Sequence, residues 1–135
     1  MQEYYESKIA PFIDGEQICY LGEMGEERKD FIARAKCVLF PTRGDEPFGL
    51  VLIEAMVCGT PVVAYNNASV PEIVLDGVTG FVVNDFEGML KAVDEVGRID
   101  PQVCRQHVVR NFNVDLMVER YLKVYQQLID SHPRE

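Results

Sequence analysis

The sequence lacks the features that mark membrane-spanning and exported chains. Its longest apolar runs, at residues 49–53 and 55–58, fall far short of the ~20 residues that cross a bilayer. Acidic residues stand among the first ten positions, and no basic segment leads into an apolar run, so we expect no signal peptide and a cytoplasmic location. No linker, repeat or low-complexity segment is found. A chain of 135 residues corresponds to about one domain.

Positive charge is also scarce. Thirteen basic residues against 22 acidic residues give a net charge of −9, and no segment concentrates lysine and arginine. This charge disfavours nucleic acid as a partner. It also disfavours a diphosphate ligand, so any phosphate site must depend on local backbone dipoles or on single cations. Hydrophobic residues make up 47% and charged residues 26% of the chain, a balance typical of a globular domain.

Groups for metal or redox chemistry are few. The sequence has no C-x-x-C pair among its four cysteines, which are Cys19, Cys37, Cys58 and Cys104. Three of them lie in apolar stretches, which favours the interpretation that they are small buried hydrophobes. The two histidines, His107 and His132, are interpreted as solvated side chains, and no histidine-based triad or metal site can be assembled from them. We therefore expect neither a metal nor a cofactor.

Two kinds of pattern alternate along the chain. Short, continuously apolar runs predict parallel strands covered on both faces, at residues 18–21, 37–40, 61–65 and 81–83. Helical patterns are found at residues 26–35, 49–58, 70–75, 86–96, 101–110 and 114–129, with a short one near residues 4–12. Ser69 and Glu72 have the spacing of a capping box, Asp85 and Asn113 are expected N-caps, and Pro47 suits a first helical turn. The alternation predicts a doubly wound α/β fold.

A glycine-rich nucleotide-binding turn is missing at the start of this pattern. The sequence contains no G-x-G-x-x-G or P-loop pattern and opens with a helix instead of a strand. In the usual strand order the two opening strands are central, so their loss leaves a gap or forces residues 18–21 to pair directly with residues 37–40. Either outcome exposes edges or apolar faces that another chain could cover. We therefore predict self-association or a partner subunit.

Residues 42–61 carry the polar groups best placed for a ligand. A polar loop containing Glu46 follows a predicted strand and leads into a helix that is apolar almost all round. Ligands bind at the carboxyl ends of parallel strands, and the first turn of a helix presents unpaired amides. The amides at positions 49–51 are thus a candidate phosphate site. Arg43 is the nearby cation, and either assists a phosphate or is an exposed structural residue.

Two glutamates stand out in this stretch. Glu54 is the only charged residue in its apolar helix, and a partly buried carboxylate needs hydrogen-bond donors. The donors are either the vicinal hydroxyls of a ribose or an arginine or backbone amide of the protein, and the spacing favours neither. Glu46, eight residues earlier, either lies near the non-nucleotide end of such a ligand or is an acidic helix-start residue favoured by the dipole.

Two longer strings change the weighing of ligand-binding against structural roles for the two glutamates. They are E-P-F-G-L-V-L-I-E-A-M-V-C-G-T-P-V-V-A and V-P-E-I-V-L-D-G-V-T-G-F-V-V. They resemble the donor-binding domain of family-four retaining glycosyltransferases, which carry an E-x7-E motif. The resemblance runs from about residue 4 to residue 125. It implies that residues 1–135 form a single C-terminal nucleotide-sugar-binding domain, one half of a GT-B fold. The sheet is then a truncated Rossmann-like parallel sheet of about four strands, without its opening strands and without the acceptor domain.

The resemblance also implies a role for each residue of the motif. Glu46 would be the catalytic-site glutamate, in contact with the donor sugar and the reacting centre. Phe48, Gly49 and Leu50 would hold the sugar and the diphosphate, and Glu54 would bind the ribose hydroxyls. The reaction would be metal-independent hexosyl transfer from a nucleotide sugar with retention at the anomeric carbon. In agreement, the sequence contains no Asp-x-Asp metal motif.

An alternative reading remains open beside this one. Catalysis in the family uses a cleft between two domains and basic residues that clamp the diphosphate, and the sequence matches neither feature. We expect the isolated chain to be inactive without an N-terminal half, which is either separately encoded or deleted. The alternative is a non-catalytic nucleotide- or sugar-binding module, or an inactive fragment.

Overall fold

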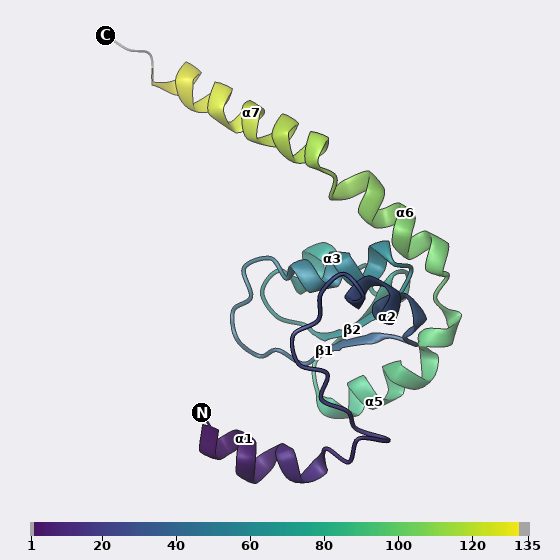
Figure 1. The fold of residues 1–135 in the computed structure, drawn as a ribbon. Coiled ribbons are helices and arrows are strands. Elements are labelled where there is room, and N and C mark those ends of the chain that lie inside the picture. The colour runs from purple at the N-terminus through teal and green to yellow at the C-terminus, as the bar shows by residue number, and fades with distance from the viewer. Residues whose placement is uncertain (1, 133–135) are drawn as a thin grey trace.

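Three parallel strands form the centre of the fold, as the computed structural model of residues 2–132 shows (Figure 1). They lie in the order β1-β2-β3, with bounds Val38–Phe40, Val62–Tyr65 and Gly80–Val83. Val62 is in register with both Val38 and Gly80. All four residues of β2 are buried, which explains why its run is continuously apolar. Three of the four predicted strands are thus confirmed to within one residue.

Helices cover both faces of this sheet. Figure 1 shows α3 on one side and α5 on the other. The helices of the sheet region are α3 (Leu50–Val57), α4 (Val70–Ile73), α5 (Phe86–Glu95), η2 (Val96–Arg98) and α6 (Pro101–Asn111). Val62 and Ala64 of β2 pack in one cluster with α3, α4 and α6, whereas Val63 and Tyr65 pack in a second cluster with α5. Because successive side chains of β2 point to opposite faces of the sheet, this strand packs against both layers of helices. This confirms the predicted α/β fold class.

The fourth predicted strand is wrong. Residues 18–21 belong to no strand, and Ile18, Tyr20 and Leu21 are at least half exposed. Asp14 folds the chain just before them, because its Oδ1 accepts hydrogen bonds from the amides of residues 16, 17 and 18. Of the two outcomes expected for a truncated sheet, the structure has the gap: residues 18–21 do not pair with β1. The outer edge of β1 is open, and Leu39 is 50% exposed.

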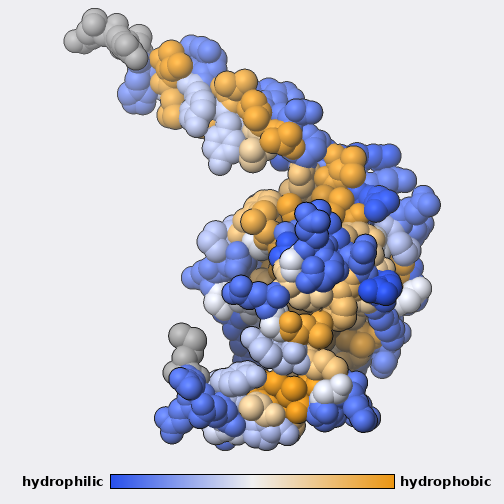
Figure 2. Space-filling view, in the orientation of Figure 1, coloured by the Kyte–Doolittle hydropathy of each residue, from blue (hydrophilic) through white to orange (hydrophobic). Residues whose placement is uncertain are grey.

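The terminal helices pack little against this body. The remaining helices are α1 (Gln2–Lys8), η1 (Ala10–Phe12), α2 (Arg28–Arg34) and α7 (Val114–Ser131). Neither α1 nor α7 has a buried residue, and Figure 1 shows α7 extending away from the sheet. Figure 2 shows apolar side chains along α7, and its predicted apolar face, including Val118, Tyr121 and Tyr125, is exposed. No helix among the described residues is long and apolar enough to cross a membrane.

The predicted helix starts are confirmed in part. Asp85 caps α5 by accepting from the Gly88 amide at 2.7 Å, and Asn113 caps α7 by accepting from the Leu116 amide at 2.8 Å. The predicted capping box at Ser69 is wrong, because its side chain makes no cap hydrogen bond to α4. Pro47 is also outside the first turn, since α3 begins at Leu50.

Candidate functional site

The carboxyl ends of the three strands carry loops that are tied to one another. The Asn67 side-chain amide donates to the Gly44 carbonyl at 2.6 Å, and Ser69 Oγ donates to the Glu46 carbonyl at 3.0 Å. The Asn66 side-chain amide donates to Asn84 Oδ1 at 3.2 Å, after β3. The turn that follows β2 therefore holds the loop that follows β1. Ser69 does not cap α4 because its backbone is helical, with φ −74° and ψ −13°, whereas a capping residue is normally extended.

Glu46 and Gly49 are the two predicted site residues that the structure joins directly. Glu46 Oε1 accepts a hydrogen bond from the Gly49 amide at 3.0 Å. Gly49 is the N-cap of α3 and has φ 76°, a left-handed conformation that glycine adopts without strain. A Cβ at this position would lie 2.9 Å from Leu52 Cδ1. The bond occupies the Gly49 amide, so the predicted phosphate site is reduced to the amides of the following two residues, which have no intrahelical acceptor.

Phe48 and Leu50 lie on either side of this turn. Leu50 is 64% exposed, and Phe48 makes an edge-to-face contact with Phe112 at the end of α6, with ring centroids 6.1 Å apart. His107 in turn contacts Phe112 and has its Nε2 2.9 Å from the Ile73 carbonyl. The prediction that His107 is solvated is therefore wrong, because its ring is partly buried and hydrogen-bonded. Phe48 thus packs against the C-terminal end of α6, and Leu50 faces solvent.

Arg43 is placed against an aromatic ring. Its guanidinium lies 5.1 Å from the centroid of the Tyr65 ring, a geometry that permits a cation–π interaction. Tyr65 itself is buried at the end of β2 and packs in the cluster with α5. Arg43 is exposed in the loop after β1. It remains at the same edge of the sheet as Glu46, and is held there by the ring.

Glu54 lies in the second turn of α3 and is half-buried, as predicted. Its Oε1 accepts a hydrogen bond from Arg28 Nη2 at 3.0 Å, in an ion pair between α3 and the first residue of α2. The arginine donor considered among the alternatives is thus present. No local pattern indicates this partner, because Arg28 lies 26 residues before Glu54 in the chain.

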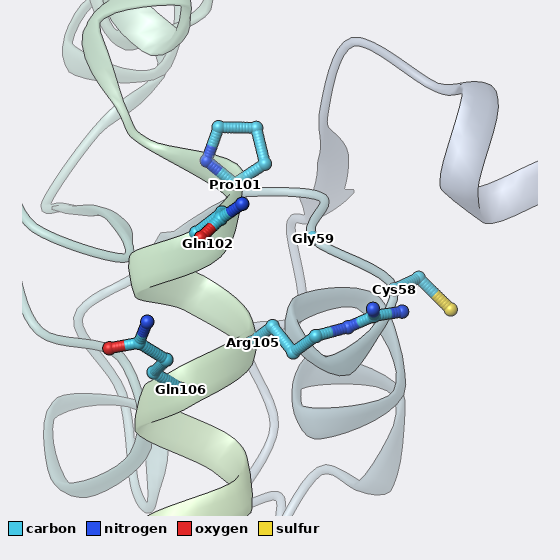
Figure 3. Close-up of a pocket in the computed structure, with 6 residues that line it drawn as sticks. All are labelled: Cys58, Gly59, Pro101, Gln102, Arg105 and Gln106. Atoms are coloured by element: carbon cyan, nitrogen blue, oxygen red, sulfur yellow. The ribbon is translucent and has the colours of Figure 1, made fainter.

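A pocket lies at the other end of α3 (Figure 3). Its volume is about 340 Å³, and its lining comes from the two residues that follow α3 and the first two turns of α6. Figure 3 shows Arg105 reaching from α6 to the end of α3, where its Nε donates to the Val57 carbonyl at 2.8 Å. None of the predicted site residues lines this pocket, and no motif pointed to it.

The cysteines offer no reactive thiolate in the core. Burial raises the pKa of Cys104 to about 11 and also raises the pKa of Cys37, so both are neutral thiols near pH 7. Cys104 fits the buried-hydrophobe interpretation, whereas Cys19 is exposed and does not. Among residues 2–132, no group of three or more His, Cys, Asp or Glu side chains could hold a metal ion.

Comparisons with known proteins show the family of the chain. The sequence model described as "Glycosyl transferases group 1" matches residues 2–98. The "Uncharacterized 41.2 kDa protein in cps region" of Klebsiella pneumoniae is 34% identical over 121 residues, which cover 84% of this chain and 33% of that protein. The phosphatidyl-myo-inositol mannosyltransferase of Mycobacterium leprae is 29% identical over 124 residues, covering 86% of this chain and 33% of that protein.

Two solved glycosyltransferase-type structures match the fold as well. AviGT4, a glycosyltransferase involved in avilamycin A biosynthesis, matches with a TM-score of 0.64 and 30% identity, over 80% of this chain and 35% of that chain. The sucrose-phosphate synthase of Thermosynechococcus elongatus matches with a TM-score of 0.74 and 26% identity, over 97% of this chain and 35% of that chain. The chain spans about a third of the length of these relatives. It belongs to the glycosyl transferases group 1 family, and its fold is consistent with a truncated Rossmann-like half of a GT-B fold.

Proposed function

We propose that this chain is the donor-binding half of a retaining glycosyltransferase, which binds a nucleotide sugar for hexosyl transfer. One observation carries the proposal: the left-handed turn at Gly49 brings the Glu46 carboxylate and the open first turn of α3 together at the carboxyl edge of the sheet. This edge is where α/β sheets of this class bind their ligands. The family match, which covers the same turn, supports the assignment.

The roles proposed for the residues follow the geometry of this edge. The amides of Leu50 and Val51, at the positive end of the α3 dipole, would receive the diphosphate. Arg43, held by Tyr65, is the loop cation that would assist them. Phe48 and Leu50 would contact the sugar through their exposed surfaces. Glu54, half-exposed on the next turn of α3, would bind the ribose hydroxyls.

Glu46 is the residue that we propose acts on the donor sugar. Its carboxylate is oriented by the Gly49 amide, and its carbonyl is held by Ser69, so both ends of the residue are fixed before a ligand arrives. A preset carboxylate stabilises positive charge that develops at an anomeric carbon without having to reorganise. We propose that departure of the diphosphate relies on amide and arginine donors, with no metal.

We also propose that sugar transfer needs a second body of protein, an N-terminal-half subunit. A second copy of the chain would serve stability alone. The open edge of β1 and the unpaired residues 18–21 support this, because a doubly wound sheet normally places two strands between them. The exposed apolar face of α7 supports it as well. Residues 1–135 are in this view one C-terminal domain, and the acceptor would be bound by the other half.

Thermal melting tests the proposal directly. The purified chain would be melted with UDP, GDP, ADP and the corresponding nucleotide sugars, beside Glu54→Ala and Glu46→Gln. One ligand at a hundred times its dissociation constant should stabilise the fold by about 2.7 kcal/mol and raise the melting temperature visibly. Glu54→Ala should abolish the shift, whereas Glu46→Gln should reduce it for the nucleotide sugar more than for the bare nucleotide.

The outcomes separate the proposal from its alternatives. No shift with any of these ligands, on a chain that melts cooperatively, would contradict donor binding by this chain. A shift that survives Glu54→Ala would contradict the placement of the site. Binding without sugar transfer, after a complementary N-terminal half is added, would identify a non-catalytic binding module.

A further inference from the structure

The ion pair between Arg28 and Glu54 joins two helices at the edge of the proposed site. Arg28 is the first residue of α2, and Glu54 lies in the second turn of α3. One nitrogen, Nη2, is 3.0 Å from one carboxylate oxygen, Oε1. The arginine therefore engages one side of the carboxylate, and Oε2 is left to accept a hydrogen bond from another group.

Folding stability does not account for this pair. Both side chains are substantially exposed, at 49% for Arg28 and 40% for Glu54, and water screens such pairs so that they stabilise a fold little. Helix α2 is already attached by other means. Ile32 is buried in the core, and its carbonyl accepts a hydrogen bond from the buried Thr60 hydroxyl at 2.7 Å. The main consequence of the pair is therefore local, on the carboxylate of Glu54.

The charges around Glu54 indicate what the ion pair does to this carboxylate. Glu54 and the nearby acidic loop residues belong to a chain with net charge −9, and a nucleoside diphosphate is itself an anion. An uncompensated Glu54 would repel it. Arg28 offsets this charge and fixes one orientation of the carboxylate. The Glu54 side chain therefore loses less conformational entropy when a ligand binds. The second cation of the edge, Arg43, lies over Tyr65.

We propose that Arg28 is a positioning residue for nucleoside recognition. It holds Glu54 through Oε1 so that Oε2 accepts a hydrogen bond from a ribose hydroxyl, and it thereby makes the site select ribonucleotides over deoxyribonucleotides. This inference rests on the proposed donor site. It assigns the ribose selectivity to the Arg28–Glu54 pair, and not to Glu54 alone.

Calorimetric titration of the full chain measures this selectivity. The ligands would be the nucleoside diphosphate that gives the largest melting shift, its 2′-deoxy form and its 3′-deoxy form. The wild type should bind the ribonucleotide about tenfold more tightly than at least one deoxy form, the value of one hydrogen bond to a charged acceptor. Arg28→Ala should reduce this ratio to about twofold or less, and Arg28→Lys should recover part of it.

Two controls separate positioning from structure and from charge. Arg28→Ala should melt near the wild type, because the exposed pair stabilises the fold little, so that a fall in the ratio is not a loss of structure. Lys29→Ala removes an equal charge from the adjacent exposed position, and should leave the ratio unchanged.

The results that would overturn the inference differ from those that would overturn the proposed function. If the wild type binds and prefers the ribonucleotide, but Arg28→Ala keeps this preference or strengthens it, only the role of Arg28 fails. Equal weakening of the ribose and deoxyribose forms by Arg28→Ala would show a general charge effect and would also overturn it. If the wild type binds no nucleotide, the proposed function itself fails and this inference fails with it.

Discussion

The two ends of helix α3 differ, although a left-handed glycine stands at each. At the C-terminal end, Gly59 has φ 86°, and the last carbonyls are occupied by the chain itself. The Ala55 carbonyl accepts from the amides of residues 58 and 60, Met56 from Gly59, and Val57 from Arg105. At the N-terminal end, Gly49 has φ 76° and its amide is bound by Glu46, but the next two amides have no intrahelical acceptor.

This difference shows how one helix serves both the fold and the site. A helix end that the protein satisfies completely, as at Gly59, contributes to stability and leaves little for a ligand to bind. A helix end that keeps open donors beside a fixed carboxylate, as at Gly49, is suited to an anion and costs some stability to maintain. The two ends should therefore respond differently to matched substitutions.

The largest effects are expected from the glycines themselves. Gly49→Ala and Gly59→Ala each force a Cβ into a left-handed conformation, so each should lower the free energy of unfolding by about 1–2 kcal/mol in urea denaturation. Only Gly49→Ala should also lower the affinity for the nucleotide, by about tenfold or more, since it disturbs the turn that carries Glu46. A comparable loss of affinity in Gly59→Ala would remove the distinction between the two ends.

The next matched pair of substitutions removes the hydroxyl that supports each end of α3. Thr60 Oγ1 donates to the Ile32 carbonyl near the closed end, and Ser69 Oγ donates to the Glu46 carbonyl at the open end. Thr60→Val and Ser69→Ala should each cost about 1 kcal/mol of stability, the net value of one buried hydrogen bond. Titration with the nucleotide should show weaker binding for Ser69→Ala alone. Unchanged affinity in Ser69→Ala would mean that the Glu46 loop holds its shape without the turn after β2.

The smallest effect is expected from Arg105. Arg105→Gln removes a cation that donates to the Val57 carbonyl at the negative end of the α3 dipole, and should cost about 0.5 kcal/mol in urea denaturation at low salt. The cost should shrink in about 1 M salt, where the screening length is only a few ångströms. Nucleotide affinity should not change. A salt-independent loss would instead indicate that packing of the arginine side chain is responsible.

Patterns that are complete within a short stretch could be predicted from the sequence. The run at residues 61–65 predicted β2 because a strand buried on both faces requires apolar residues throughout. Asp85 and Asn113 were predicted as caps because a cap and its amide partner lie three residues apart. The same kind of pattern failed at Ser69, whose backbone is helical and not extended and whose hydroxyl points to the distant Glu46 carbonyl.

What could not be predicted depends on partners far apart in the chain. Residues 18–21 have the composition of a strand, but a strand needs neighbours, and none stands beside them in residues 2–132. The half-buried environment of Glu54 was expected from its apolar neighbours, whereas its pairing with Arg28 is set by how α2 packs on α3. The roles of Glu46, Phe48 and Leu50 toward a donor remain predictions.

The length of α7 has a practical consequence for studying association. Its 18 residues rise by about 1.5 Å each, so the helix is about 27 Å long, with Val114 at one end and Ser131 at the other. Ser131 is exposed, and Figure 1 places this end of the helix well away from the sheet. A fluorophore attached there would lie at the end of α7 farthest from Phe112, which contacts Phe48 at the proposed nucleotide site. Energy transfer from it to a partner would therefore report docking along α7 separately from ligand binding.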